Sequence, residues 1–384
     1  MSAPLAGLKV VELARILAGP WCGQTLADLG AEVIKVESPE GDDTRRWGPP
    51  FADRPGDRSA AYFHSCNRGK QSVAADFRTA EGQALVRALV AEADVLIENF
   101  KLGGLQQYGL DWDSLQAVNP RLIYCSITGF GQDGPYAHRA GYDYIIQGMS
   151  GLMSITGAPE GQPQRVGVAV VDLFTGSYAT TAILAALHQR QATGLGQRID
   201  LGLLDVAVAM TANQAMNYLV SGTPPGRTGN WHPNLTPYQV FDCADGFIII
   251  ATGNDAQYRR LCAVLNLAEI ATAPDYLTNA DRIAHRQALH DRLTAATRRR
   301  SKADLLAACE AEGIPAGPIN DMAEVFADPQ VQARGMRMEL GGIASVRPPF
   351  RFSGAGIAPT RPSPRLDEHG DAIRARFGIR GRAD

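Results

Sequence analysis

Short apolar runs alternate with longer amphipathic segments along the first half of the chain. Two amphipathic segments, 21–29 and 79–92, carry the spacing of a helix with one buried face. The apolar runs indicate buried strands, and they are 8–13 (LKVVEL), 31–36 (AEVIKV), 94–98 (DVLIE) and 122–127 (LIYCSI). Because parallel strands need helical crossovers, this alternation predicts an α/β fold with a Rossmann-like, doubly wound sheet.

The pattern changes near Ser221-Gly-Thr-Pro-Pro-Gly226, a stretch of turn-forming residues that is typical of a linker. Beyond it, two β-rich runs flank Ala244-Asp-Gly246, which is a hairpin signal, and a helix-rich stretch follows to about Glu312. We therefore expect three segments. Residues 1–220 form the first part of a large Rossmann-like domain, 228–318 form a small α+β domain, and 319–384 form a connector and the C-terminal part of the large domain.

Composition narrows the function classes. The 384 residues are 45% hydrophobic and 20% charged with a net charge of −3, which argues against a nucleic-acid binder. There is no uninterrupted apolar window of 18 residues and no signal peptide, so no membrane span is expected. The six cysteines are scattered without a CxxC pair, which predicts free thiols in a reducing cytoplasm and no metal site.

The first strand–helix–strand unit has the outline of a dinucleotide-binding fold but lacks its fingerprint. Its turn carries only Gly19 and Gly23, four residues apart, and no G-x-G-x-x-G lies near it. The backbone therefore lacks the usual close approach to a pyrophosphate. The topology is expected to be Rossmann-like, without a nicotinamide or flavin cofactor.

One aspartate, Asp172, stands at an expected strand-to-helix corner. The apolar run 166–171 predicts a buried strand, and Thr175–Gln191 is a long apolar helical pattern. A carboxylate at such a corner lies near the positive end of the helix, where it stays ionised. Asp172 is then either a helix N-cap or a nucleophile ready to attack an electrophile, and the local pattern leaves both interpretations open.

Several motifs taken together resemble the family III coenzyme A transferases, also called the CaiB/BaiF family, which includes formyl-CoA transferase and carnitine CoA-transferase. They occur in order over essentially the whole chain. The matching segments are 8–15 (LKVVELAR), 18–20 (AGP), 30–37 (GAEVIKVE), 41–45 (GDDTR), 61–63 (AYF), 67–72 (NRGKQS), 94–100 (DVLIENF), 129–131 (GFG), 134–135 (GP), 141–143 (GYD), Asp172, 194–197 (GLGQ) and 317–320 (GPIN).

The resemblance implies an enzyme, and an interlocked homodimer of ring-like subunits, each with a Rossmann-like large domain built from both chain ends. It places Asp172 at the catalytic aspartate and implies no permanently bound cofactor and no metal, with acyl-CoA and a carboxylic acid as the substrates. The implied coenzyme A contacts are Arg15, Leu17, Ala18, Ala75, Phe77, Arg78, Asn99, Phe100, Lys101, Arg139 and Tyr142. The implied contacts of the acyl end are Trp47, Tyr62, Tyr142 and Asp143.

The motifs also bear on the acceptor acid. Residues 234–241 (NLTPYQVF), with 317–320, most resemble the branch that passes CoA from succinyl-CoA to glutarate or hydroxymethylglutarate. A racemase is the first alternative, but its Gly-His-Asp segment reads Gly141-Tyr-Asp143, and tyrosine is a poor partner for α-proton exchange. A formyl-CoA:oxalate transferase is the second alternative, and Leu17 in place of glutamine counts against it. Because Lys101-Leu-Gly103 and Gln107 depart from the family pattern, the phosphate contacts of that loop stay open.

Overall fold

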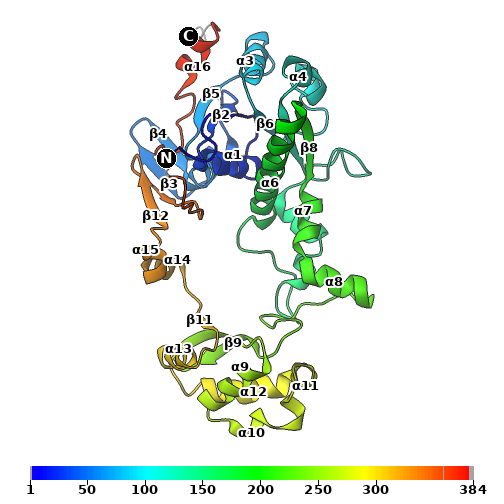
Figure 1. The fold of residues 1–384 in the computed structure, drawn as a ribbon, viewed down its shortest axis with the longest axis vertical. Coiled ribbons are helices and arrows are strands. Elements are labelled where there is room, and N and C mark those ends of the chain that lie inside the picture. The colour runs from blue at the N-terminus through cyan, green and yellow to red at the C-terminus, as the bar shows by residue number, and fades with distance from the viewer. Residues whose placement is uncertain (1, 358, 380–384) are drawn as a thin grey trace. The chain divides into compact units, whose positions relative to one another are not determined.

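The computed structural model describes residues 2–357 and 359–379, and the chain divides into two compact units (Figure 1). The first unit takes in 1–152, 165–223 and 329–384, so it is built from both ends of the chain. The second takes in 153–164 and 224–328. The segment expected to form the small domain, 228–318, falls within the second unit, which also includes 153–164 and extends beyond 318 to 328.

A six-stranded parallel sheet is the centre of the first unit. Its strands are β1 (Lys9–Glu12), β2 (Glu32–Glu37), β5 (Gln71–Ala74), β6 (Val95–Glu98), β7 (Ile123–Thr128) and β8 (Gln197–Gly202). They lie in the order β5-β2-β1-β6-β7-β8, and every neighbouring pair is parallel. This is the doubly wound order, in which the direction of winding reverses between β1 and β6.

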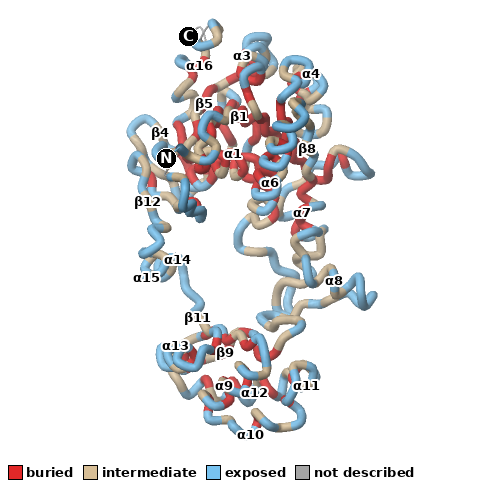
Figure 2. Tube along the Cα trace, in the orientation of Figure 1, coloured by how far each residue is buried: buried red, intermediate tan, exposed pale blue. Residues whose placement is uncertain are grey.

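Each face of the sheet is covered by a different set of helices, as the buried interior in Figure 2 reflects. On one face Val10, Ile97 and Cys125 pack with residues of α1 (Ala18–Asp28), α5 (Asp143–Met149), α6 (Val170–Thr193) and α7 (Leu203–Met210). On the other face Val11, Leu96 and Tyr124 pack with residues of α3 (Ala80–Ala91), α4 (Trp112–Val118) and α16 (Gly370–Arg376). The central strands are therefore apolar on both sides, which explains their continuous apolar runs.

The remaining elements of the first unit are short, apart from one further helix. They are η1 (Asp43–Arg46), β3 (Phe51–Arg54), β4 (Asp57–Ala60), α2 (Ala61–His64), η2 (Gln106–Tyr108), α8 (Ala212–Ser221), α15 (Pro329–Ala333), β12 (Arg337–Leu340) and β13 (Ile343–Val346). The pairs β3–β4 and β12–β13 are antiparallel hairpins.

The second unit has its own sheet and core. Strands β9 (Tyr238–Cys243), β10 (Gly246–Ala251) and β11 (Ala316–Pro318) pair antiparallel in the order β11-β10-β9, which confirms the predicted hairpin at 244–246. Phe241, Ile248 and Ile250 pack with residues of the surrounding helices. Its helical elements are η3 (Met153–Ile155), α9 (Asp255–Val264), α10 (Ala268–Ala271), η4 (Pro274–Tyr276), α11 (Asn279–Ala284), α12 (Arg286–Thr297), α13 (Lys302–Ala311) and α14 (Met322–Ala327).

Among the described residues, only α6 has the length and composition of a helix that could cross a membrane, with a mean hydropathy of 1.5 over 18 residues. Val171, Ala179, Ile183 and Ala186 of this helix are buried in the core of the first unit. The core helix of a soluble protein passes the same test, so length and composition alone do not make α6 a membrane span.

A buried carboxylate, Glu12 at the end of β1, is fully enclosed and held by two lysines. Lys35 Nζ lies 3.1 Å from Glu12 Oε1, and Lys70 Nζ lies 2.8 Å from Glu12 Oε2. Gly23 of α1 leaves the room for this carboxylate, since a Cβ at that position would lie 1.8 Å from Glu12 Oε2. The G-x-x-x-G spacing of the α1 turn therefore serves packing against an ion pair rather than binding of a pyrophosphate.

We predict that Gly23→Ala lowers the free energy of unfolding by about 1–3 kcal/mol, because the added methyl group must displace a fully buried carboxylate that two lysines hold. Urea unfolding of the purified protein measures this change. Gly354→Ala is the matched control, since its Cβ would meet nothing within 4 Å; we expect it to change the unfolding free energy by less than about 0.5 kcal/mol. Equal effects of the two substitutions would contradict the packing argument.

Candidate active site

Asp172 lies inside the first turn of α6, not at the end of a strand. Residues 166–169 form no strand, and the helix begins at Val170, so the predicted strand 166–171 is wrong. The N-cap position is Ala169, which offers no side chain to the free N–H groups. Asp172 is therefore not an N-cap residue, and its carboxylate is not committed to capping its own helix.

The cap of α6 comes instead from another helix. Asp143, the first residue of α5, accepts hydrogen bonds through Oδ2 from the backbone N–H groups of Val171 (2.8 Å) and Asp172 (3.3 Å). Its other oxygen, Oδ1, accepts a hydrogen bond from Gln147 Nε2 at 2.6 Å. Asp143 was predicted as a contact of the acyl end of the substrate, and the structure shows that both of its oxygens already have protein donors.

The environment of Asp172 opposes its ionisation. Its side chain is half-buried, and burial together with the nearby Asp143 carboxylate raises the pKa of Asp172 to about 7. Among the residues that the structure describes, none donates a hydrogen bond to the Asp172 carboxylate or pairs with it. The raised pKa runs against the expectation that its place on α6 keeps Asp172 ionised, because burial and the charge of Asp143 both favour the neutral form. A carboxylate in this state is a stronger nucleophile than an exposed one once its proton has left.

Two aromatic residues predicted at the acyl end, Trp47 and Tyr62, form an edge-to-face pair with ring centroids 5.3 Å apart. Burial, and next the charge of Asp172, raises the pKa of Tyr62 to about 12. Tyr62 therefore stays protonated at neutral pH and can donate a hydrogen bond. Trp47 is 47% exposed.

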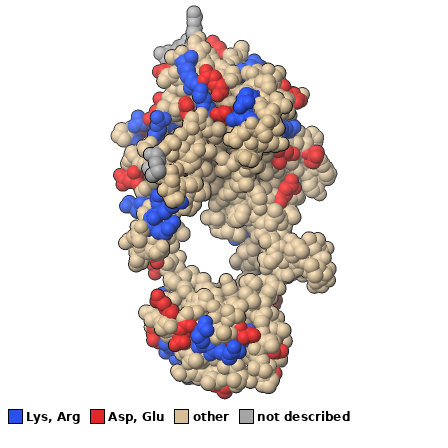
Figure 3. Space-filling model, viewed as in Figure 1, with Lys and Arg blue, Asp and Glu red and all other residues tan. Residues whose placement is uncertain are grey.

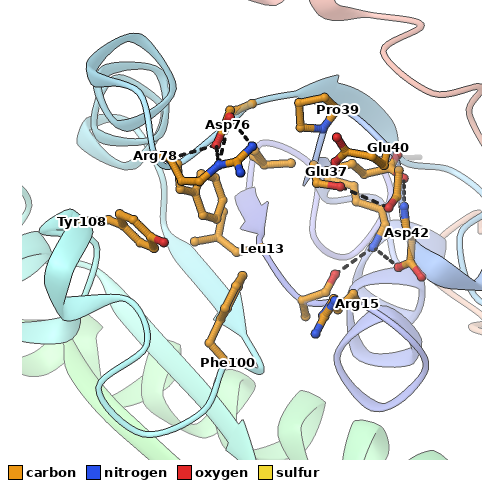
Figure 4. A pocket seen from close by; sticks show the side chains of 17 residues that line it. Leu13, Arg15, Glu37, Pro39, Glu40, Asp42, Asp76, Arg78, Phe100 and Tyr108 are labelled. Carbon is orange, nitrogen blue, oxygen red and sulfur yellow. Dashed lines mark hydrogen bonds and ion pairs between the residues drawn. The ribbon is translucent and has the colours of Figure 1, made fainter.

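A cavity of about 460 Å³ opens at the carboxyl edge of the sheet, beyond the ends of β1, β2, β5 and β6 (Figure 4). This edge cavity lies where the winding of the sheet reverses, the usual ligand position in open α/β sheets. Five predicted coenzyme A contacts line it, namely Arg15, Ala75, Phe77, Arg78 and Phe100. Asp172 is not among the lining residues.

Both exposed arginines of the edge cavity already have carboxylate partners. Arg78 Nε and Nη2 donate to Asp76 at 2.8–3.1 Å, and Arg15 Nη1 lies 3.1 Å from Asp43. Figure 4 shows Arg78 and Tyr108 across the cavity from Glu37, Glu40 and Asp42. An anionic ligand therefore has to compete with Asp76 for Arg78.

Two of the acidic residues on the opposite wall, Glu37 and Asp42, pair with buried cations, Arg45 and Lys35. Glu37, at the end of β2, accepts hydrogen bonds from Arg45 Nη2 (2.7 Å) and Ser72 Oγ (2.7 Å). Although burial opposes the charge, these partners keep the pKa of Glu37 below its usual value. Glu37 thus ends its strand like the acidic residue of a dinucleotide site, but its oxygens are taken up by Arg45, Ser72 and the backbone N–H of Asp42.

The loop between β1 and α1 joins the edge cavity to the surroundings of Asp172. Asn99 fixes it by accepting from Arg15 N (3.0 Å) and donating to Arg15 O (2.7 Å). Leu17 is the N-cap residue of α1, and Leu17 and Ala18 are buried. A Cβ on Gly176, one turn after Asp172, would lie 2.6 Å from Ala18 O, so this loop packs directly against α6.

Three further predicted contacts lie outside the edge cavity. Lys101 lines an adjacent cavity of about 160 Å³ together with Glu98 and Arg198. Arg139 stacks over Tyr136, with its guanidinium carbon 4.5 Å from the ring centroid. Tyr142 is 61% exposed and immediately precedes α5.

The described residues hold no cluster of three His, Cys, Asp or Glu side chains that could bind a metal ion. All six cysteines are buried and free. Acidic and basic side chains are interspersed on the face shown in Figure 3. Recognition of an anion therefore has to come from local contacts rather than from a field of one sign.

Two residues of the site gave no usable signal in the sequence. Gln147 is fully buried and ties Asp143 to the segment before α6 through Val166 N, which donates to Gln147 Oε1 at 2.9 Å. Ile16 has a φ of 72°, which L-residues with branched side chains rarely adopt, and its N–H donates to Asp42 Oδ2 at 3.2 Å. Neither residue type marks a site by itself, and only the fold brings each to its partner.

Comparison with known proteins identifies relatives over nearly the whole chain. The profile of CoA-transferase family III matches residues 5–370. A succinate–glutarate CoA-transferase of Agrobacterium fabrum is 58% identical, with 95% of this chain and 94% of that protein covered. A succinyl-CoA:glutarate CoA-transferase of Mus musculus is 43% identical, covering 95% and 84%. The crystal structure of a CaiB/BaiF family protein from Brucella suis has a TM-score of 0.90 at 60% identity, covering 98% and 100%.

We predict that Asp172→Asn stabilises the folded chain at neutral pH but much less at acid pH. Because the pKa of Asp172 rises from 3.8 to about 7 on folding, the folded chain binds more protons than the unfolded chain between these values. Its unfolding free energy therefore falls as pH rises through that window. Asparagine has no such penalty, so the gain in melting temperature should grow from pH 5 to pH 7 and level off above. A pH-independent difference would contradict the raised pKa.

Proposed function

The chain belongs to CoA-transferase family III, and on that premise we propose that it transfers coenzyme A from succinyl-CoA to a dicarboxylate, with glutarate as the first candidate. The names of the two relatives described above support this choice of donor and acceptor. The observation that carries the chemistry is the half-buried, unpaired carboxylate of Asp172 in the first turn of α6, beside Tyr62. The same relatives are transferases, so the racemase alternative is not favoured.

In the first half-reaction, the ionised Asp172 carboxylate attacks the thioester carbonyl of succinyl-CoA. The C–S bond breaks, coenzyme A leaves as the thiolate, and an aspartyl–succinyl mixed anhydride forms. The thiolate then attacks the aspartyl carbonyl, which releases succinate and leaves an aspartyl-CoA thioester. Aspartate suits this sequence because its carboxyl group can become both an anhydride and a thioester.

In the second half-reaction, the acceptor carboxylate attacks the aspartyl-CoA carbonyl and again expels the thiolate. The thiolate attacks the acceptor carbonyl of the new anhydride, giving glutaryl-CoA and restoring the Asp172 carboxylate. The free energy of the thioester is kept at every step, so neither ATP nor a metal is required. The oxyanions that develop need hydrogen-bond donors, and the backbone N–H groups of Ala18 and Gly19 in the first turn of α1 are candidates.

The edge cavity is the proposed site of coenzyme A, with Phe77 and Phe100 on its wall and Arg78 near its mouth. From there the pantetheine arm would pass the Arg15–Ala18 loop toward Asp172. That loop packs on α6 beside the aspartate, which supports this route. Trp47, Tyr62 and Tyr142 remain the proposed contacts of the acyl and acceptor groups.

The proposed assembly is an interlocked homodimer, and the proposed location is the cytoplasm. Exposed apolar side chains on α6 and α8 support coverage by a second copy: Phe174 is 47% exposed, Tyr178 46%, Leu219 71% and Val220 80%. Six buried free cysteines fit a reducing compartment.

Asp172→Ala should lower kcat/KM by at least a thousandfold, because the nucleophile is lost while folding is not affected.

With succinyl-CoA as donor, a panel of glutarate, hydroxymethylglutarate, oxalate and acetate should give the highest kcat/KM for glutarate. Hydroxylamine added with succinyl-CoA should trap an aspartyl hydroxamate at residue 172, detected by peptide mass spectrometry. A loss below about tenfold, ~1.4 kcal/mol, would reject Asp172 as nucleophile, and a preference for oxalate would reject the acceptor.

Arg78→Ala and Asp76→Asn should change the KM for succinyl-CoA in opposite directions. Removing Arg78 takes away a phosphate partner and raises KM, whereas removing the Asp76 charge frees the guanidinium for the ligand and lowers KM. We expect severalfold changes in KM, with kcat within twofold, because the pair is exposed and screened by solvent. An increase of KM in Asp76→Asn would show that the pair, rather than free Arg78, holds the nucleotide.

A further inference from the structure

Gln147 is hydrogen-bonded to Asp143, the residue that caps the helix of the nucleophile, and the reaction sequence above gives Gln147 no role. It is fully buried in α5, one helical turn after Asp143, so the two side chains lie on the same face of the helix. Its Oε1 accepts from Val166 N at 2.9 Å, and its Nε2 donates to Asp143 Oδ1 at 2.6 Å. The orientation of the amide is fixed by Val166, because a backbone N–H can only donate.

The bonds of Gln147 reach the nucleophile through one intermediate. Asp143 Oδ2 receives the N–H groups of Val171 and Asp172, so the Gln147 amide, the Asp143 carboxylate and the first turn of α6 form one continuous chain. Gln147 thereby binds the segment before α6 directly, at Val166 N, and the start of the helix indirectly, through Asp143. Since Ala169 caps nothing, this chain is what fixes the backbone of Asp172.

The same chain distinguishes the two carboxyl groups by their hydrogen-bond donors. Asp143 has three N–H donors, from Gln147, Val171 and Asp172, whereas Asp172 has none among the described residues. Both oxygens of Asp143 are therefore engaged as acceptors, Oδ1 by Gln147 and Oδ2 by the two backbone N–H groups. Gln147 is the only side-chain donor of the three.

We propose that Gln147 is a positioning residue of the transferase: it holds Asp143 in the orientation that caps α6 and so places the Asp172 carboxylate for attack. This inference rests on the proposed role of Asp172 as nucleophile. It assigns Gln147 no contact with the substrate.

The charged and titratable groups around this chain belong to few elements. Asp143 and Tyr144 lie on α5 and Asp172 on α6, while Arg165, just before α6, donates to the carbonyl groups of Val166 and Gly167. Asp205 lies on α7, which packs against α5, and the charge of Asp172 acts on Tyr62 of α2. The new carboxyl group introduced below would titrate among these groups, and its nearest neighbour would be Asp143.

The test is Gln147→Glu, which keeps the acceptor for Val166 N but replaces the donor toward Asp143 by a carboxyl group. When this group is protonated its O–H can donate to Asp143 as the amide does. When it is ionised, two carboxylates face each other across the 2.6 Å contact. We expect kcat to fall at least tenfold as pH rises through the ionisation of the introduced carboxyl group. This gives the pH–rate profile a falling limb, whereas the ionisation of Asp172 gives it a rising limb.

The reciprocal swap, Asp143→Asn with Gln147→Glu, should remove this limb. The asparagine introduced at position 143 can accept from Val171 and Asp172 through its oxygen and donate through its amide nitrogen to the carboxylate introduced at position 147. The other oxygen of that carboxylate accepts from Val166 N. Every hydrogen bond is therefore kept, while the carboxylate lies at position 147, farther from Asp172, instead of at position 143. The rising limb of kcat/KM should then shift to lower pH. Gln147→Leu, which has neither bond, should lose at least tenfold in kcat at every pH, with the KM for succinyl-CoA within twofold.

Gln24→Glu is the matched control, because Gln24 is also buried, accepts from a backbone N–H (Arg68) and donates to a carbonyl oxygen (Ser65). It should lower stability without changing the shape of the pH profile. A wild-type-shaped profile for Gln147→Glu, or an unshifted rising limb in the swap variant, would overturn the proposal. If the single variant does not fold, the swap decides. Activity retained by Asp172→Ala would instead reject the proposed function, independently of Gln147.

Discussion

The carboxylate of Glu12, buried between Lys35 and Lys70, holds the carboxyl edge of the large sheet together. Removing one member would leave an unpaired buried charge, a cost of about 3–5 kcal/mol in comparable sites. The lysines also donate to two carbonyl oxygens, Ala14 O in the loop between β1 and α1 (2.7 Å) and Pro20 O in the first turn of α1 (2.9 Å). Lys35 also pairs with Asp42, which accepts a hydrogen bond from Ile16 N. One ionic cluster thus fixes both the loop beside the edge cavity and the start of α1.

The carboxyl groups around that loop fall into two electrostatic classes. Glu37 and Asp42 are surrounded by cations and hydrogen-bond donors, and these keep the pKa of both groups below the usual values despite burial. In the part of the chain that the structure describes, Asp172 has neither, and its pKa rises to about 7. Burial is common to all three residues, so the difference comes from their partners. The carboxylates of the first class hold the loop through ion pairs and hydrogen bonds, whereas the carboxyl group of the second class is left without such partners among the described residues.

Much of this arrangement follows from the sequence. The alternation of apolar strands with helical segments predicted the parallel sheet, and the hairpin signal at 244–246 was confirmed. The start of α6 was not predicted, because the run 166–171 is apolar enough for a strand and Ala169, at the N-cap position, offers no capping side chain. The cap comes from Asp143, 29 residues before Asp172, which only the folded chain brings to the first turn. The raised pKa of Asp172 has the same origin, since its cause is a distant carboxylate and desolvation rather than a neighbour in the sequence.

The cap that Asp143 supplies to α6 has a consequence for how this scaffold can be redesigned. In a helix that is capped by the residue before it, that residue must carry a hydrogen-bonding side chain. In α6 the cap is Asp143, so the side chains at positions 167–169 are not needed for capping. Gly167 has open space around its Cβ position, and Val168 is 55% exposed. The segment before α6 can therefore be given new side chains without removing the hydrogen bonds that hold the first turn of the helix. Because the residue that caps the helix is separate from the residues that precede it, this segment can vary while the backbone of Asp172 keeps its place.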